Sequence, residues 1–382
     1  MKKILHIGQV IGGLDTYIRN IVENSNSDKF QFVIALGEQD EYKPFKGKNV
    51  SIKEYKIKLA RNINLINDVI CVFQILKIVK IEKPDIIHCH SAKGGFIGRI
   101  VGALTRKKTF YTPNAFSFLT AKNSIIKFIY LSLEKYLKFN TYLLACSESE
   151  RQIGIKEVGY KPCNALVWKN AVNDIRSSST FKNLNSDKFI CFIGRPSFQK
   201  NVFFLVDVIA DVCKKIPDFK IYLLGVGYHS PDLTLLKSKI EYNKLENNII
   251  LHPWVSQSEV LSYLNQSLYY LSVARYEGLP FSILEAMALS KPIIASNVVG
   301  NIDCVKNDYN GYVLPLDIQC FSSKIIELWN SQETREIFGQ NSRKKYLEEF
   351  NLANQIKLLE DIYSEINPEN KDNISARAGL QL

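Results

Sequence analysis

The sequence predicts an α/β protein of two Rossmann-like domains, each a parallel sheet with helices on both faces. Its 382 residues exceed what one hydrophobic core usually fills. Apolar segments typical of buried strands alternate with segments of helical periodicity, without long gaps. Residues 173–187 are polar and serine-rich, as is typical of a linker. We therefore expect one domain over residues 1–174 and a second over 188–345.

The first domain opens with an apolar strand at Lys3–Ile7, a glycine loop and an amphipathic helix from Thr16. The glycines do not match the Gly-x-Gly-x-x-Gly fingerprint, so by spacing alone Gly12 and Gly13 are ordinary turn residues. Expected next are strands at 30–36, 50–55, 85–90, 109–118 (ending in a turn), 142–146 and 166–172, and helices at 63–81, 122–138 and from 147. A turn is expected at 91–96, where Gly94 and Gly95 follow a strand.

The second domain repeats this alternation. Its expected elements are strands at 189–194, 221–227, 248–255, 269–274 and 291–296, and a helix at 202–214. A long helical pattern runs from 334 to 366, with an expected break near Phe350 and Asn351. Residues 367–382 are polar and predict a frayed tail.

The composition is that of a soluble globular protein, with 46% hydrophobic and 23% charged residues. No apolar run approaches the roughly 18 residues of a membrane span, and the N-terminus lacks signal-peptide features, so we expect a cytoplasmic protein. The eight cysteines form no Cys-x-x-Cys pair. Free thiols in a reducing compartment explain them better than disulfides or zinc ligands.

The positive charge lies in the N-terminal half. Residues 1–174 contain 27 basic and 15 acidic residues, and residues 175–382 contain 22 and 23. No nucleic-acid recognition motif accompanies this excess, so we do not expect a nucleic-acid partner. An anionic membrane surface or a pyrophosphate-bearing lipid fits the charge. The lysine-edged helix at 122–138 could lie on such a membrane, although a core helix with solvated lysines is the more ordinary interpretation.

Two carboxylates occur in the segment 275–289. Gly278 and Pro280 end the preceding strand pattern, which places Glu277 on a loop, and Ser282 can cap the following helix. The unpaired N–H groups of a helix start, here those of Phe281 and Ser282, suit an anion such as a nucleotide diphosphate. Glu285 would then lie in the first helical turn, where a capping box with Ser282 is the alternative to a binding role.

Two further pairs could bind ligands. Arg195 and Lys200 lie at an expected strand-to-helix turn, where they suit a diphosphate or are solvated surface charges. His88 and His90 face the same way on a strand and could ligate a metal, but the sequence indicates no third ligand nearby, so we expect a hydrogen-bonded pair.

The two glutamates, separated by seven residues, resemble the glutamate motif of glycosyltransferase family 4 (glycosyl transferases group 1), in its bacterial polysaccharide type. The resemblance implies that Glu277 lies beside the donor sugar and that Glu285 binds the ribose. Arg195 and Lys200 match the basic pair that binds the donor diphosphate in this family.

The resemblance extends to the first domain. Gly12 and Gly13 match a glycine loop at which backbone approaches the donor phosphate, and the stretch with His88 and His90 matches part of the cleft wall. Asn114 stands where the family usually has a catalytic histidine. An amide can bond a sugar hydroxyl but cannot take up a proton near neutral pH, which puts an acid or base role in doubt.

The resemblance implies the GT-B fold, in which two Rossmann-like domains face a central cleft and the last helix, about 350–366, crosses back to the first domain. It implies a retaining transferase that takes a hexose or N-acetylhexosamine from a nucleoside diphosphate sugar. The expected acceptor is a polyprenyl diphosphate-linked saccharide for O-antigen or capsule, used at the inner face of the plasma membrane. A sugar-nucleotide 2-epimerase of the same fold and a non-catalytic sugar-nucleotide-binding protein are the alternatives.

The chain contains no Asp-x-Asp sequence, which would supply the usual carboxylate bridge for a divalent metal. We therefore expect no metal and no cofactor. The charge of the leaving group should instead be offset by Arg195, Lys200 and the helix N-terminus.

Overall fold

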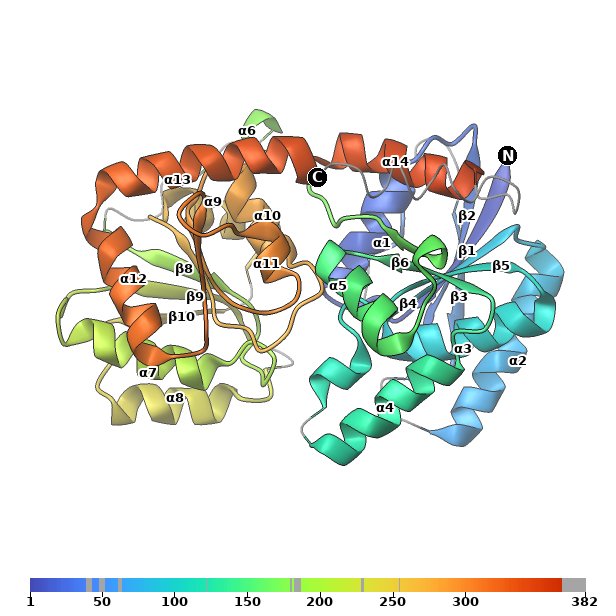
Figure 1. Cartoon of the computed structure of the whole chain (residues 1–382), viewed down its shortest axis with the longest axis horizontal. Coiled ribbons are helices and arrows are strands. Elements are labelled where there is room, and N and C mark those ends of the chain that lie inside the picture. Colours follow the sequence, from blue (N-terminus) through green and yellow to red (C-terminus); the bar gives the residue numbers. More distant parts are fainter. Residues whose placement is uncertain are drawn as a thin grey trace. The chain divides into compact units, whose positions relative to one another are not determined.

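The computed structural model (Figure 1) describes residues 1–38, 43–47, 52–60, 64–121, 123–178, 181, 187–227, 230–253 and 255–365. The chain divides into two compact units. Unit 1 comprises Met1–Ala171 and the chain from Leu352, and unit 2 comprises Val172–Asn351. The expected polar tail at 367–382 and residues 179–180 and 182–186 of the expected linker lie outside the described residues, whereas Ile175–Ser178 of that linker form a short helix.

Within the described residues, unit 1 contains a sheet of seven parallel strands in the order β3-β2-β1-β4-β5-β6-β7. The strands are β1 (Lys2–Gly8), β2 (Phe30–Gly37), β3 (Lys53–Ile57), β4 (Ile86–His90), β5 (Lys108–Thr112), β6 (Thr141–Ala145) and β7 (Ala165–Val167). Apart from the edge strand β3, which is mostly polar and partly exposed, these strands are largely apolar and buried, as the inner strands of a parallel sheet require. The strand order reverses between β1 and β4, which is the switch point where Rossmann-like units bind ligands.

Helices cover both faces of this sheet. They are α1 (Gly13–Asn24), α2 (Leu65–Glu82), α3 (Ser91–Thr105), α4 (Ser124–Tyr136), α5 (Glu148–Ile153) and α14 (Leu352–Glu365). Side chains of α2, α3 and α4 pack into one apolar cluster on one sheet face. The C-terminal helix α14 is fixed to unit 1 by the Trp168 indole, which donates to the Gln355 carbonyl at 2.7 Å, and by Lys2, which donates to the Tyr363 carbonyl at 3.0 Å.

The turn expected at residues 91–96 is wrong, because these residues form the first turns of α3. Their glycines are needed for close packing on the sheet. A Cβ at Gly94 would lie 2.7 Å from the Ile7 carbonyl oxygen, and a Cβ at Gly95 would lie 2.1 Å from the Tyr111 ring. The helix therefore sits directly on β1 and β5.

Over its described residues, unit 2 contains a sheet of six parallel strands in the order β10-β9-β8-β11-β12-β13, with its switch point between β8 and β11. The strands are β8 (Ile190–Ile193), β9 (Ile221–Val226), β10 (Ile249–Pro253), β11 (Tyr270–Ser272), β12 (Ile293–Ser296) and β13 (Gly311–Leu314). The helices are α6 (Ile175–Ser178), α7 (Val202–Cys213), α8 (Leu233–Tyr242), α9 (Gln257–Gln266), α10 (Phe281–Ala288), α11 (Asn301–Cys304), α12 (Ile318–Asn330) and α13 (Gln332–Lys345).

The expected break in the C-terminal helical pattern is confirmed. After α13, residues Tyr346–Phe350 form a π-helical turn, and Asn351 separates this turn from α14. All eight cysteines lie in the described part of the chain and are free, as predicted. None of the described helices combines the length and apolar character that a membrane crossing requires.

Candidate functional site

The central feature of unit 2 is an ion pair at its switch point. Lys200 lies on the loop after β8, and Glu277 lies on the loop after β11, as the sequence predicted for the glutamate. Adjacent parallel strands bring these two loops together. The Lys200 ammonium group donates to Glu277 Oε1 at 2.8 Å, and the carboxylate is only 6% exposed.

The Glu277 carboxylate holds Lys200 in its charged form. Burial lowers the pKa of Lys200, but the charge of Glu277 and its hydrogen bond raise the pKa by more, so the net pKa lies above its ordinary value. Arg195 lies on the same loop as Lys200, between β8 and α7, and its positive charge opposes this rise. The second oxygen of Glu277 accepts from the Gln199 amide at 3.2 Å.

The lysine stem depends on a glycine. A Cβ at Gly194 would lie 2.9 to 3.1 Å from three carbons of the Lys200 side chain, and Gly194 has a φ of +153°. Only glycine fits both the close approach and this backbone conformation. Gly194 therefore sets the path of the side chain that reaches Glu277.

The helix α10 begins directly after the Glu277 loop. Its N-cap is Pro280, so the prediction that Ser282 caps the helix is wrong. Ser282 lies in the first turn, where its hydroxyl accepts from the Tyr270 hydroxyl at 2.9 Å. The backbone N–H groups of Phe281 and Ser282 still belong to the orphan donors of a helix start, and Ser282 is tied to β11.

The capping-box interpretation of Glu285 is also wrong. Its carboxylate accepts a hydrogen bond from the Gln257 amide on α9 and makes no bond to the start of its own helix. Although part of the side chain is accessible, the surrounding protein desolvates the carboxylate and raises its pKa to about 7, while the bond from Gln257 lowers it. Glu285 is thus poised to change charge near neutral pH.

Gly300 brings a third loop to this region. Its φ is +81°, and a Cβ at this position would lie 2.2 Å from the carbonyl oxygen of Gly278. The loop after β12 is therefore packed backbone to backbone against the loop that carries Glu277.

In unit 1, the predicted glycine loop follows β1. Gly12 is the N-cap of α1 with a φ of +62°, and Gly13 is the first helical residue. Both are exposed, and a Cβ at Gly12 would meet nothing within 4 Å. Gly12 is therefore required by its backbone conformation, and the start of α1 is open to a ligand.

Asn114 lies on the loop after β5 in the left-handed conformation, with a φ of +52°. The next residue, Ala115, also has a positive φ, of 78°. The buried carboxylate of Glu150 holds this turn, since it accepts from the N–H groups of Ala115 at 2.7 Å and Cys146 at 2.8 Å. Within the described part of the chain, the buried Nδ2 of Asn114 has no hydrogen-bond partner. An unsatisfied donor at the carboxyl edge of the sheet is available to a ligand oxygen.

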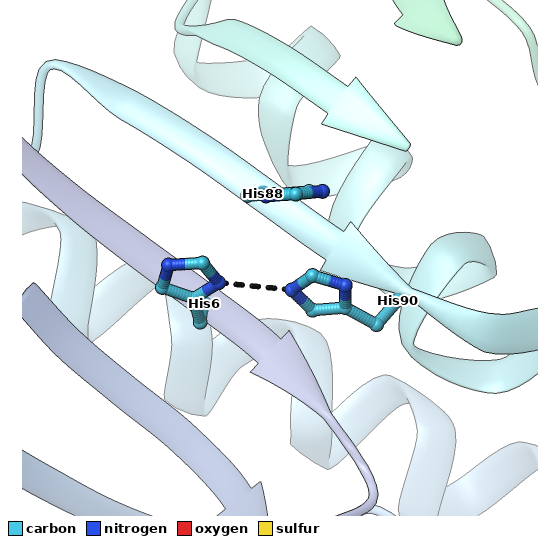
Figure 2. A group of neighbouring side chains, drawn as sticks. All are labelled: His6, His88 and His90. Carbon is cyan, nitrogen blue, oxygen red and sulfur yellow. Dashed lines mark hydrogen bonds between the residues drawn. The ribbon is translucent and has the colours of Figure 1, made fainter. Parts of the chain in front are cut away.

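Figure 2 shows His6 on β1 beside His88 and His90 on β4. The prediction that His88 and His90 form part of a cleft wall is wrong, because both side chains are fully buried within unit 1. The two histidines also do not pair with each other. Instead, His90 Nε2 lies 2.9 Å from His6 Nδ1.

His88 is bonded on both ring nitrogens. Nε2 lies 2.9 Å from the Thr112 hydroxyl, and Nδ1 lies 2.6 Å from the Tyr363 hydroxyl. Because Thr112 donates to the Leu144 carbonyl, the Nε2–H of His88 donates to Thr112 and Nδ1 accepts from Tyr363. Burial lowers the pKa of His6 to about 3 and the pKa values of His88 and His90 well below their usual range.

The three histidines bring ligand atoms within 4.8 Å of one another. The sequence therefore missed His6 as a third candidate ligand. A metal bound there would require His88 to give up one of its two bonds, so the contacts of these histidines describe a neutral hydrogen-bonded network.

The structure thus brings the predicted residues of unit 2 together. Lys200, Glu277, Ser282 and Glu285 lie on or directly after the loops at the switch point of one sheet, with Arg195 acting on Lys200. Sequence reasoning missed the residues that hold these side chains. They are Gly194, Gln199, Gln257, Tyr270 and Gly300. Two cations, a helix start and two carboxylates can bind a diphosphate and the hydroxyl groups attached to it.

Two family models match the chain, and between them they span most of it. The model described as Glycosyltransferase Family 4 matches residues 11–176, and the model described as Glycosyl transferases group 1 matches residues 175–345.

Two curated relatives show where such sequences occur. The UDP-Gal:alpha-D-GlcNAc-diphosphoundecaprenol alpha-1,3-galactosyltransferase of Escherichia coli is 29% identical over 80% of this chain and 81% of its own length. The capsular polysaccharide biosynthesis glycosyltransferase CapM of Staphylococcus aureus is 25% identical over 81% of this chain and 84% of its own.

Solved structures share the fold. Sucrose-phosphate synthase from Thermosynechococcus elongatus superimposes with a TM-score of 0.80 at 16% identity and covers 96% of this chain and 99% of its own. HepE from Anabaena, solved in complex with UDP and glucose, has a TM-score of 0.78 at 15% identity and covers 96% of this chain and all of its own. The architecture is that of the GT-B glycosyltransferases.

Proposed function

Because this chain belongs to the group 1, family 4 glycosyltransferases, we propose that it transfers a hexose or N-acetylhexosamine from a nucleoside diphosphate sugar, with retention of anomeric configuration. The observation that carries this proposal is the buried Lys200–Glu277 pair beside the start of α10. It joins a cation for the diphosphate to a carboxylate for the sugar in one site.

We assign the donor diphosphate to Lys200, Arg195 and the first N–H groups of α10. When the bond between the sugar and the diphosphate breaks, negative charge develops on the leaving phosphate. Fixed cations and helix N–H groups stabilise that charge without reorganising. Lys200 would then face two anions, the diphosphate and Glu277, which keeps it charged and in place.

The two glutamates have different tasks in this proposal. Glu277 lies on the loop before α10 and contacts the sugar. Glu285 lies four residues into α10, where its carboxylate accepts from the ribose hydroxyls and displaces the Gln257 amide or shares the carboxylate with it. In unit 1, Gly12 and Gly13 offer backbone to the donor phosphate, and Asn114 offers its free Nδ2 to a sugar hydroxyl.

We further propose a polyprenyl diphosphate-linked saccharide as the acceptor, in the assembly of a bacterial O-antigen or capsule at the inner face of the plasma membrane. The name of the Escherichia coli relative, which specifies a diphosphoundecaprenol-linked sugar, supports this acceptor class. The excess of basic residues in the N-terminal half also suits a diphosphate lipid.

Calorimetry with free nucleoside diphosphates tests the assignment. Glu285→Gln should weaken binding by about 1.5 to 3 kcal/mol, the range for a hydrogen bond to a charged group. Glu277→Gln frees Lys200 for the diphosphate, so the affinity of the enzyme for free nucleoside diphosphate should not fall. Turnover should drop, because the contact between Glu277 and the sugar is lost. Undiminished binding by Glu285→Gln would remove the ribose assignment.

A thermal-shift screen of UDP-, GDP- and ADP-sugars would identify the donor base, since a bound ligand stabilises the folded state. Product analysis then separates the alternatives. Release of free epimerised sugar without an acceptor would indicate a 2-epimerase. Donor binding without transfer to any polyprenyl diphosphate acceptor would indicate a binding protein.

A further inference from the structure

The helix α4 in unit 1 exposes its apolar residues, whereas a core helix buries them. Its apolar residues at i, i+3, i+4, i+8 and i+11 point outward, with Ile125 73% exposed, Phe128 72% and Tyr136 82%, and with Ile129 and Leu133 also exposed. The interpretation of residues 122–138 as a core helix is therefore wrong for the described part, 123–138. An apolar stripe of this kind on a soluble surface marks an interaction site.

The inner side of α4 is fixed by a buried polar contact. Glu134 is 2% exposed, pairs with Arg99 on α3 at 3.0 Å, and accepts from the Tyr111 hydroxyl at 3.0 Å. A buried carboxylate bonded in this way requires this side of the helix to face the protein. The outward direction of the apolar stripe therefore follows from the packing of α4 in unit 1.

The helix α2 shows the same arrangement. Leu65, Ile66, Val69 and Phe73 are exposed along one side, and its opposite side packs into the apolar cluster that also receives α3 and α4. Since α2 and α4 pack on the same face of the sheet, their apolar stripes point away from that same face. We call these two stripes the apolar face of unit 1. Both helices are seen in Figure 1.

The charged residues on the two helices differ in burial according to their sign. Every residue of α2 and α4 is described, and their three acidic residues all point inward and are paired. Asp68 bonds Lys93 at 2.6 Å, Glu82 bonds Lys3 and Lys53, and Glu134 bonds Arg99. The lysines of these helices, in contrast, are exposed: Lys77, Lys80, Lys127 and Lys135. By helical spacing Lys77 and Lys80 lie within the α2 stripe and Lys135 lies at the edge of the α4 stripe, whereas Lys127 lies on the side of Glu134.

We propose that the apolar face of unit 1 docks on an anionic lipid bilayer, with the α2 and α4 stripes inserted and Lys77, Lys80 and Lys135 at the headgroups. A second copy of the chain fits less well, because a symmetric pairing would bring these uncompensated lysines toward one another. Apolar insertion with electrostatic attraction to anionic lipid is how interfacial helices bind. The proposal deepens the proposed function, since a polyprenyl-linked acceptor resides in the bilayer.

Vesicle flotation of the full chain tests the proposal. We expect binding to vesicles of phosphatidylcholine mixed with phosphatidylglycerol and weaker binding to phosphatidylcholine alone. Ile125→Ser/Phe128→Ser should weaken binding at least about tenfold, because two side chains no longer leave water. The matched control is Leu235→Ser/Tyr242→Ser, which alters two similarly exposed apolar residues on α8 of unit 2 and should bind as wild type does.

The lysines are tested separately. At roughly fivefold per lysine near an anionic surface, Lys77→Gln/Lys80→Gln should weaken binding to the mixed vesicles about 25-fold and leave binding to phosphatidylcholine unchanged. Wild-type binding by the Ile125→Ser/Phe128→Ser variant would overturn the proposal. The proposal would also be overturned if the wild-type protein were a dimer and the Ile125→Ser/Phe128→Ser variant a monomer, because that result would assign the surface to a second copy of the chain.

These outcomes are independent of turnover. A protein that floats with anionic vesicles but transfers no sugar would refute the proposed function and leave the docking surface supported. Retained transfer to a short-chain polyprenyl acceptor in detergent by Ile125→Ser/Phe128→Ser, together with lost vesicle binding, would support both.

Discussion

Removal of the Lys200 ammonium group should destabilise unit 2, because it leaves Glu277 as a buried carboxylate without its cation. Methionine at this position keeps the stem that packs on Gly194 and removes the charge. The remaining donor to the carboxylate is the Gln199 amide, at 3.2 Å. Breaking a buried pair typically costs 3 to 5 kcal/mol. Because the Lys200 side chain is 20% exposed, we expect the lower end, about 3 kcal/mol.

A double-mutant cycle separates the pair from its surroundings. Glu277→Gln should lower the free energy of unfolding of unit 2 less than Lys200→Met does, since the lysine left behind is partly solvated. The double variant should lower the free energy of unfolding of unit 2 little more than Lys200→Met alone does. The coupling energy between the two substitutions should be at least about 1.5 kcal/mol. Lys214→Met is the matched control. Its pair with Asp211 is at the surface, with the lysine 74% exposed, so the loss should stay below about 1 kcal/mol.

The measurement must read unit 2 by itself, because two units need not unfold in one transition. Urea unfolding followed by pulsed amide hydrogen exchange gives the free energy of unfolding for each unit. At roughly 2 to 4 °C per kcal/mol for a unit of this size, the melting temperature of unit 2 should also fall by about 6 to 12 °C. Additive effects of the two substitutions, within about 0.5 kcal/mol, would show that the contact does not act as a buried pair.

Three further predictions follow from the site. The affinity for UDP should rise between pH 6 and pH 8 and then level off, since Glu285, with a pKa of about 7, must ionise to accept from ribose. Calorimetry should show a smaller rise in Glu285→Gln, because only the terminal phosphate of UDP, with a second pKa of about 6, then changes its charge. Gly300→Ala should cost about 2 kcal/mol or more and weaken donor binding, because its Cβ meets the Gly278 carbonyl, and unchanged thermal stability would contradict the packing described. Arg195→Ala should lower turnover by at least about 10²-fold, because a cation that stabilises the leaving phosphate is lost. A chelator should leave wild-type turnover intact. Inactivation by the chelator that Mg²⁺ reverses would mean that a metal carries the charge assigned to Arg195 and Lys200.

The sequence predicted best those features that local patterns encode. Buried parallel strands are continuous apolar runs, so most strands of both sheets were found within a few residues. The helix break at Asn351 and the loop position of Glu277 follow from turn residues in the same way. The resemblance of the glutamate and basic pairs to family 4 then led to the fold class.

The errors arose where contacts distant in sequence decide the structure. The local sequence predicts a turn at Gly94 and Gly95, because the close approach of these glycines to β1 and Tyr111 depends on residues distant in the sequence. The direction of α4 depends on the Glu134 pair with Arg99, and periodicity alone cannot tell an inward stripe from an outward one. Glu285 bonds Gln257 rather than its own helix start for the same reason.

The protonation states of the residues near the strand ends in unit 1 limit which group can take the proton of the acceptor hydroxyl. His88 and His90 have strongly lowered pKa values and are buried, and Asn114 cannot accept a proton near neutral pH. We therefore expect the proton of the acceptor hydroxyl to pass to Glu277 or to an oxygen of the donor diphosphate. His90→Gln should accordingly leave the pH dependence of kcat unchanged even where it lowers stability, because an amide can keep a bond to His6. Loss of one limb of the pH profile in this variant would place a histidine in the proton path and contradict the neutral network.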